Sequence, residues 1–157
     1  MTGSGGSRAV HGSGSSSLGS GVLVRRAAAS SVASLFVARA RIHPGRLAVE
    51  DAARTLTYGE LAERTRRLAG ALASRGVKRG DRVALLSENR AEYLEVFLAA
   101  ARLGAIVACP SWRLAPPELA YCLELVSPSL VFASPRHAEK LGAMAGDAIV
   151  FLSLIHI

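Results

Sequence analysis

Residues 83–109 read VALLSENRAEYLEVFLAAARLGAIVAC. The segment opens with a continuous apolar run at residues 83–86, which has the length and composition of a strand buried on both faces of a parallel sheet. Residues 91–103 have a helical pattern that Gly104 ends, and residues 106–109 form a second apolar run of strand length, closed by Pro110. The apolar stripe of the intervening helix is expected at Leu94, Phe97, Leu98 and Ala101.

The same alternation continues toward the C-terminus. A third helix is predicted from Glu118 to about Leu125, with Pro116 and Pro117 in its first turn, where a missing amide proton costs nothing. Three further elements are predicted in order: a buried strand at 130–133, a weaker helix at 135–145 and a strand at 148–152. Strands that alternate with helices predict an α/β fold with a partial doubly wound parallel sheet and helices on both faces.

Upstream of this region the best-defined element is another helix. Thr57 and Glu60 have the spacing of a capping box, and Gly76 supplies a left-handed stop. Before it, residues 32–40 form a short helical candidate that His43-Pro44-Gly45 breaks. Residues 47–50 and 54–56 are expected to pair as a hairpin.

Charge is unevenly distributed along the chain. The formal net charge is +7, but residues 1–46 contain six arginines and no acidic residue, whereas residues 47–157 contain 13 basic and 12 acidic residues. The part with a folding pattern is therefore nearly neutral and lacks the basic face that nucleic-acid binding needs. A nucleic-acid-binding arm is an alternative that rests on residues 1–46 alone. No apolar run approaches the ~20 residues of a transmembrane helix.

The first 26 residues are predicted to be a disordered leader. Residues 1–21 are rich in Gly and Ser and have almost no large apolar side chains, so burial cannot offset the entropy of ordering them. This leader contains no apolar stretch like that of a secretory signal peptide, which argues against a secretory signal. We therefore expect a cytoplasmic protein. An organellar location is the alternative, because an Arg- and Ser-rich segment without acidic residues is typical of transit peptides.

The sequence lacks the loops and clusters of several enzyme classes. It contains no G-x-x-x-x-G-K-[ST] loop, no G-x-G-x-x-G between a strand and a helix, and no G-x-S-x-G elbow. Its four histidines and two cysteines have no metal-ligand spacing, so no metal site is predicted. Cys109 and Cys122 are expected to be buried thiols that behave as small apolar groups. His43 and His137 are expected to be solvent-exposed.

Few side chains are candidates for ligand binding. Residues 87–90 (SENR) follow a predicted strand, and open α/β sheets bind ligands beyond the carboxyl ends of their strands. The alternative is that these residues only cap the next helix. Trp112 lies in the equivalent loop of the next strand and either anchors that loop or packs against a ligand. Arg113 either faces a phosphate or pairs with Glu118.

Four segments, in order and at normal spacing, resemble the N-terminal part of the adenylate-forming superfamily, which includes acyl-CoA synthetases, 4-coumarate ligases and luciferases. They are 56–61 (LTYGEL), 76–84 (GVKRGDRVA), 88–93 (ENRAEY) and 103–121 (LGAIVACPSWRLAPPELAY). The resemblance covers about residues 31–150, and its Trp112-Arg113-Leu114 variant is most like fatty-acyl-CoA synthetases. One departure is Cys109-Pro110-Ser111, where the family usually has a small or aliphatic residue, then Pro, then Leu, Val or Ile, and then Asn.

The resemblance implies an AMP-forming ligase that joins a carboxylic (fatty) acid to coenzyme A, using ATP and Mg²⁺ through an acyl-adenylate. The family's Ser/Thr/Gly-rich loop ending Pro-Lys-Gly and its catalytic Lys are not found in this sequence. No catalytic, cofactor-binding or metal-binding residue is therefore assigned here. We expect residues 27–150 to be an incomplete N-terminal subdomain, and residues 151–157 to be a non-native tail, because LSLIHI is similar to translated sequencing-adapter read-through.

Besides the nucleic-acid-binding arm, two functional hypotheses follow from the sequence. The first is a fragment of an ATP-dependent acid–CoA ligase, inactive by itself. The alternative is a complete small doubly wound α/β module that binds a ligand or a partner without catalysis.

Overall fold

A computed structural model describes residue 1, residues 30–142 and residues 149–150 of the chain. The chain divides into two compact units, and every element described below lies in the second, Ser31–Ile157. The predicted leader therefore lies almost entirely outside the described residues, as does the predicted tail.

The described unit begins with a helix and a hairpin. Helix α2 (Val32–Ile42) extends two residues beyond the predicted range, and the Ser31 hydroxyl accepts a hydrogen bond from the Ser34 amide at its start. Strands β1 (Leu47–Glu50) and β2 (Thr55–Thr57) pair antiparallel, which confirms the predicted hairpin. A carboxylate oxygen of Asp51 accepts hydrogen bonds from the amides of Ala53 and Arg54, so this residue fixes the turn.

Helix α3 (Tyr58–Ser74) starts at the predicted capping box. The Thr57 amide donates to the Glu60 carboxylate at 2.8 Å, and the Glu60 amide donates to the Thr57 hydroxyl at 3.3 Å. These two bonds satisfy amide groups that the first helical turn leaves without partners. Leu61, Leu68 and Leu72 are buried, and their spacing of seven and four residues places them on one face of the helix.

Four parallel strands form the central sheet in the order β4-β3-β5-β6. They are β3 (Arg82–Leu86), β4 (Ile106–Ala108), β5 (Leu130–Ala133) and β6 (Ile149–Val150). The connecting helices are α4 (Ala91–Leu103), α5 (Pro116–Val126) and α6 (Pro135–Leu141). The predicted parallel α/β sheet is thus confirmed. Residues 143–145 of the predicted last helix and residues 148, 151 and 152 of the predicted last strand lie outside the described residues.

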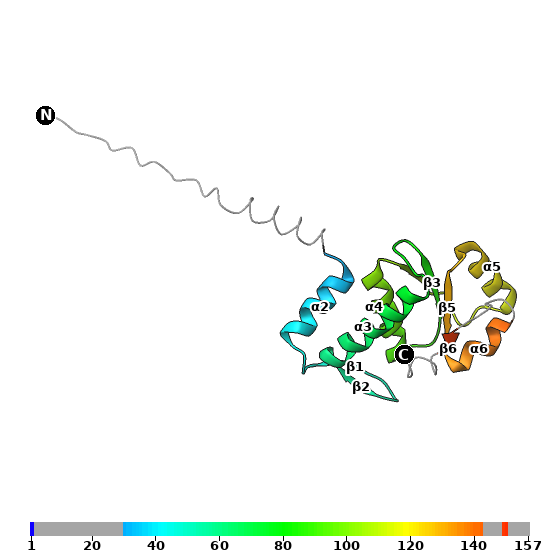
Figure 1. Ribbon diagram of the computed structural model, residues 1–157, viewed down its shortest axis with the longest axis horizontal. Helices are drawn as coiled ribbons and strands as arrows, with labels where there is room; N and C mark the ends of the chain where they lie inside the picture. Colours follow the sequence, from blue (N-terminus) through cyan, green and yellow to red (C-terminus); the bar gives the residue numbers. More distant parts are fainter. Residues whose placement is uncertain (2–29, 143–148, 151–157) are drawn as a thin grey trace. The chain divides into compact units, whose positions relative to one another are not determined.

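Alternate residues of the sheet point into two separate cores, as the period of a strand requires. Val83, Leu85 and Phe132 pack against α3 and α4, whereas Ala84 and Leu86 pack against α5 and α6. Figure 1 shows α3 and α4 on one side of the strands and α5 and α6 on the other. The sheet is therefore covered on both faces, which explains its continuous apolar runs.

The burial expected for β4 and for the stripe of α4 is wrong. Strand β4 was expected to be buried, but it is the edge of the described sheet and Ile106 is 57% exposed. The stripe predicted for α4 is also misplaced, because Leu94 is 38% exposed while Glu92 and Glu95 are buried. The two glutamates are buried because arginines of other elements pair with them, as described below.

The expectation of two buried thiols is also wrong. Cys109 is exposed and Cys122 is half-buried. Cys109 is exposed because it comes directly after β4, the edge of the described sheet.

Candidate ligand-binding edge of the sheet

The strand order places a topological switch point between β3 and β5. After β3 the chain crosses to β4 on one side of the sheet, and after β5 it crosses to β6 on the other. Both connections start at the carboxyl ends of the parallel strands and run in opposite directions along the sheet. They cover opposite faces of the sheet, because α4 packs in one core and α6 in the other. Open α/β sheets bind ligands in the crevice at such a point, outside the carboxyl ends of the strands.

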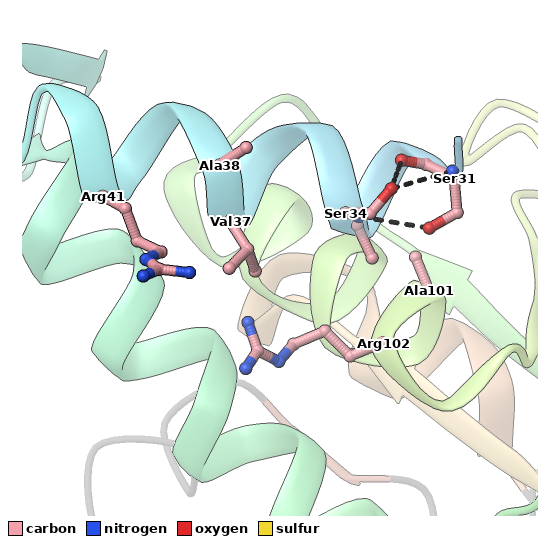
Figure 2. A pocket seen from close by; sticks show the side chains of 8 residues that line it. Ser31, Ser34, Val37, Ala38, Arg41, Ala101 and Arg102 are labelled. Atoms are coloured by element: carbon pink, nitrogen blue, oxygen red, sulfur yellow. Dashed lines mark hydrogen bonds between the residues drawn. The ribbon is translucent and has the colours of Figure 1, made fainter. Parts of the chain in front are cut away.

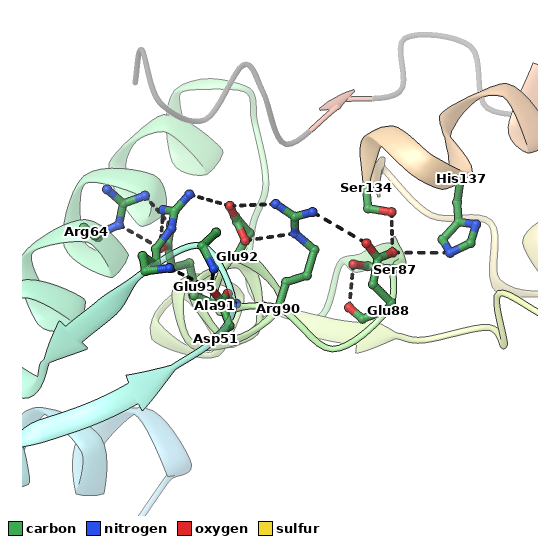
Figure 3. A network of polar contacts seen from close by, with 12 residues as sticks. Asp51, Arg64, Ser87, Glu88, Arg90, Ala91, Glu92, Glu95, Ser134 and His137 are labelled. Carbon is green, nitrogen blue, oxygen red and sulfur yellow. Dashed lines mark hydrogen bonds and ion pairs between the residues drawn. The ribbon is translucent and has the colours of Figure 1, made fainter.

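Polar residues from both connections meet at this switch point. The Ser134 hydroxyl, directly after β5, donates a hydrogen bond to a Glu88 carboxylate oxygen at 2.7 Å. His137 of α6 places its Nε2 atom 3.3 Å from the same oxygen (Figure 3). Glu88 belongs to the segment 87–90 that the sequence singled out, whereas Ser134 and His137 were not predicted as its neighbours. The order of strands in a sheet is not readable from their sequences, so this juxtaposition was missed.

Glu88 is held in its ionised form at this position. Partial burial raises the pKa of its carboxyl, but the hydrogen bonds from Ser134 and from its own backbone amide, together with the charges of His137 and Arg90, outweigh burial. The resulting pKa lies below the ordinary value of 4.5. The carboxylate is therefore a fixed negative charge between two loops near neutral pH.

His137 is buried, contrary to the expectation of a surface residue. Its ring stacks on Trp112, with ring centroids 5.2 Å apart and the planes inclined by 16°. Within the described part of the chain its Nε2 atom has no partner with hydrogen-bond geometry, although Glu88 is close enough for an ion pair.

Trp112 anchors its loop to α6, and anchoring is one of the two roles considered for it. Besides the stacking on His137, the backbone oxygen of Trp112 accepts a hydrogen bond from Lys140 Nζ at 2.7 Å. The guanidinium group of Arg113 lies over the indole ring, 4.6 Å from its centroid. Arg113 does not pair with Glu118, whose carboxylate instead accepts a hydrogen bond from the Ala115 amide at the start of α5. Arg113 is thus an exposed cation at this edge.

The start of α4 is capped from a distant part of the sequence. Arg90 occupies the N-cap position without a side-chain capping bond, and the Ala91 amide donates to Asp51 Oδ2 at 2.7 Å. This bond is the main reason that the pKa of Asp51 lies below its ordinary value of 3.8. The hairpin turn is thereby attached to the carboxyl edge of the sheet, beside a pocket of about 330 Å³ that Asn89, Arg90 and Tyr93 help to line.

Two buried glutamates of α4 extend this polar network. Arg64 donates to both carboxylate oxygens of Glu95 at 2.7 and 3.0 Å (Figure 3). Arg54 donates to Glu92 at 2.6 Å. The hydrogen bonds to Glu95 are the largest cause of a raised pKa of Arg64. Burial raises the pKa of Glu92. The hydrogen bonds from Arg90 and from its own backbone amide, together with the charges of Arg54 and Arg90, outweigh burial, so the pKa lies below its ordinary value of 4.5. These pairs hold α3, α4 and the hairpin in one arrangement.

A second hollow lies away from this edge. It has a volume of about 430 Å³ and is lined by α2 and by Ala101 and Arg102 of α4. Figure 2 shows the side chains of Arg41 and Arg102 projecting into it. Helix α4 begins at the carboxyl edge of the sheet and ends at the opposite edge, so this hollow is not part of the switch-point site.

The described residues contain no group of three or more His, Cys, Asp or Glu side chains that is placed to hold a metal ion. In the same part of the chain, no helix has both the length and the apolar character needed to cross a bilayer. The chemistry that this edge offers is therefore that of a fixed carboxylate, a stacked histidine and tryptophan, and nearby arginines.

Comparison with known proteins identifies relatives of this chain. The sequence model of the family described as AMP-binding enzyme matches residues 36–152. Feruloyl-CoA synthase of an Amycolatopsis species is 40% identical over 114 residues, which are 73% of this chain and 23% of that protein. Indoleacetate–CoA ligase of Aromatoleum aromaticum is 38% identical over 116 residues, 74% of this chain and 22% of that protein.

Solved structures agree with this similarity. A fatty acyl CoA synthetase of Mycobacterium tuberculosis matches with a TM-score of 0.74 and 27% sequence identity, over 80% of this chain and 27% of that one. The chain spans less than a quarter of the length of the two curated relatives. The likeness therefore concerns one part of a larger architecture.

Proposed function

Because this chain belongs to the AMP-binding enzyme family, we propose that it forms the N-terminal part of a ligase that activates a carboxylic acid with ATP and transfers the acyl group to coenzyme A. The match of residues 36–152 to the family carries the proposal. It is supported by relatives named as acid–CoA ligases and by a parallel sheet whose polar carboxyl edge suits ligand binding.

The chain's own contribution is a scaffold for that edge. Glu88, Ser134 and His137 hold the connections after β3 and β5 together, and Asp51 fixes the start of α4. ATP would supply the adenylyl group and Mg²⁺ would accompany its phosphates, but the 157 residues contain no Ser/Thr/Gly-rich loop ending Pro-Lys-Gly. We therefore assign neither group to a residue of this chain.

The proposed acyl substrate is a fatty acid, on the basis of the Trp112-Arg113-Leu114 variant of the motif. An aromatic acid is the second candidate, because the two curated relatives are named for ferulate and indoleacetate. We further propose that residues 27–150 are one subdomain of the ligase and that the ligase acts in the cytoplasm, with an organelle as the alternative.

A segment exchange tests this function. Residues 31–150 would replace the matching segment of the Amycolatopsis feruloyl-CoA synthase, and ATP-dependent formation of feruloyl-CoA and of fatty acyl-CoA would be measured. We expect a folded exchange protein that forms an acyl-CoA. A protein that folds with the stability of its parent but forms neither product would contradict the proposal.

The 157-residue chain by itself is proposed to be inactive. Positioned phosphate contacts carry most of the rate enhancement in adenylyl transfer, and no such loop is present in its sequence. We expect no ATP–pyrophosphate exchange above background with ferulate, indoleacetate or long-chain fatty acids. Exchange that depends on one of these acids would overturn this part of the proposal and leave the family assignment intact.

A further inference from the structure

The hollow between α2 and the C-terminal end of α4 exists because short side chains line it. On α2, Ser34, Val37 and Arg41 follow one another at spacings of three and four residues, so they share one face of the helix. Most of the lining residues are alanine or serine, namely Ser31, Ala33, Ser34, Ala38 and Ala101. These side chains do not fill the space between the helices, and a volume of about 430 Å³ stays open.

Two arginines make this hollow positively charged. Figure 2 shows the guanidinium groups of Arg41 and Arg102 turned into it, on either side of the Val37 side chain. None of its described lining residues is an aspartate or a glutamate, and α2 contains neither. Within the described residues, Arg41 and Arg102 have no ion pair and no side-chain hydrogen bond. Other arginines of the same unit each pair with a glutamate: Arg54, Arg64, Arg66, Arg67 and Arg90.

The places of the two arginines in their helices do not explain this arrangement. Both lie in the last turn of a helix, where the helix dipole stabilises a cation. That effect favours an arginine at each position, but it does not require the two side chains to enter one hollow. Like charges in one hollow repel each other, and Arg102 is half-buried, so water screens its charge only in part. An anion in the hollow would remove this repulsion and accept hydrogen bonds from both groups.

We propose that Arg41 and Arg102 bind the phosphate group of a small organic phosphate in this hollow. A guanidinium presents a planar fork of N–H donors that matches two phosphate oxygens, and two guanidinium groups together match the charge of a dianion. A carboxylate has only one negative charge and fits the pair less well. Arg41 is exposed, so the ligand can enter from solution.

The size of the hollow indicates that the ligand is more than a free phosphate ion. Small-molecule sites have volumes of roughly 300–1,000 Å³, and about 430 Å³ lies within this range. Val37, Ala38 and Ala101 offer an apolar wall to an organic group beside the phosphate. The site lies away from the switch point and does not depend on the ligase function.

Phenyl phosphate is the probe, because it joins a dianionic phosphate to a small apolar ring. It would be titrated into the isotope-labelled full chain at constant ionic strength, and amide chemical shifts would be followed by NMR. We expect saturable shifts at the amides of Val37, Arg41 and Arg102. Benzoate has the same ring but one negative charge, and inorganic phosphate has no ring, so both should bind more weakly.

The variants R41Q and R102Q test the two arginines separately. Each removes one charge-assisted pair of hydrogen bonds, so phenyl phosphate should bind about tenfold more weakly. The matched control is R136Q, which removes the same charge. Arg136 is exposed on α6, which packs on the other face of the sheet, so its loss should leave binding unchanged. Thermal unfolding of each variant would establish that the fold is retained.

Several results would overturn the proposal. One is a set of shifts that do not saturate or that leave the amides of Arg41 and Arg102 unchanged. Another is equal weakening in R136Q, because the net charge of the chain and not this pair would then attract phosphate. Binding of benzoate as tight as that of phenyl phosphate would show that the hollow does not select a phosphate group. Unchanged binding in R41Q or R102Q would show that the two arginines do not act together.

Discussion

At the scale of single residues, burial in α4 depends on charge pairs that its own sequence does not reveal. Glu92 and Glu95 are 4% and 2% exposed, while the apolar Leu94 between them is 38% exposed. A hydrophobic stripe read from one helix cannot include a glutamate, because the arginine that permits its burial comes from another element. Glu60, by contrast, was predicted correctly, since its partner Thr57 is three residues away.

The substitution E95Q tests the buried pair. It removes the negative charge that faces Arg64 and Arg54, and breaking one partner of a buried pair costs about 3 kcal/mol. We expect a clear decrease in the urea concentration at the midpoint of unfolding. The control is E63Q, because Glu63 also pairs with two arginines but on the exposed surface of α3. An equal decrease in both variants would contradict the assigned role of burial.

At the scale of elements, several boundaries were predictable from local signals, whereas contacts between elements far apart in the sequence were not. The range 91–103 matches α4 and the range 130–133 matches β5, because apolar runs, Gly104 and the prolines mark them locally. The attachment of the hairpin to α4 through Asp51 joins residues 40 positions apart. The switch-point site was missed for the same reason, since Glu88 and Ser134 are 46 residues apart.

Asp51 gives α4 a cap whose strength depends on pH. Its pKa is lowered in the folded protein, so its stabilisation is fully present above pH 3.8 and is lost as the pH falls through the folded pKa. We expect D51A to lose about 1 kcal/mol at pH 7, the usual cost of removing a cap. D51N keeps a capping oxygen but cannot titrate.

Urea unfolding at pH 7 and at pH 3 would measure this dependence. The wild-type chain should lose more stability between the two pH values than D51N does. Identical losses in both proteins would show that Asp51 does not contribute to the acid sensitivity of the fold.

Two glycines of neighbouring elements are predicted to respond in opposite ways to alanine. Gly104 ends α4 with a φ of +73°, and an added Cβ would lie 3.1 Å from Arg79 Cγ. G104A should therefore cost about 1–2 kcal/mol. Gly70 lies within α3 with open space around it, so G70A should stabilise the chain by about 0.5–1 kcal/mol. Thermal unfolding of both variants would check the signs, and a stabilising G104A would contradict this account.

At the scale of the whole described unit, apolar side chains gather at the β4 edge. Ile106 of β4 is 57% exposed, and Leu125, which lines a pocket together with Ala108 of β4, is 73% exposed. An edge strand with exposed apolar side chains is prone to pair with another chain, and a lysine on such an edge opposes this pairing. We expect the wild-type chain to associate with rising concentration in sedimentation experiments and I106K to associate less without a lower melting temperature. If the wild-type chain and I106K associate equally, the contact between chains does not involve Ile106.

The parallel pairing of β3 and β5 creates the switch point and brings Glu88 to Ser134 and His137. Nuclear Overhauser effects between the two strands test it directly in the isotope-labelled chain. We predict contacts that follow the parallel register Ala84 to Val131 and Leu85 to Phe132. Close contacts between α-protons across the two strands, the mark of antiparallel pairing, would contradict the account.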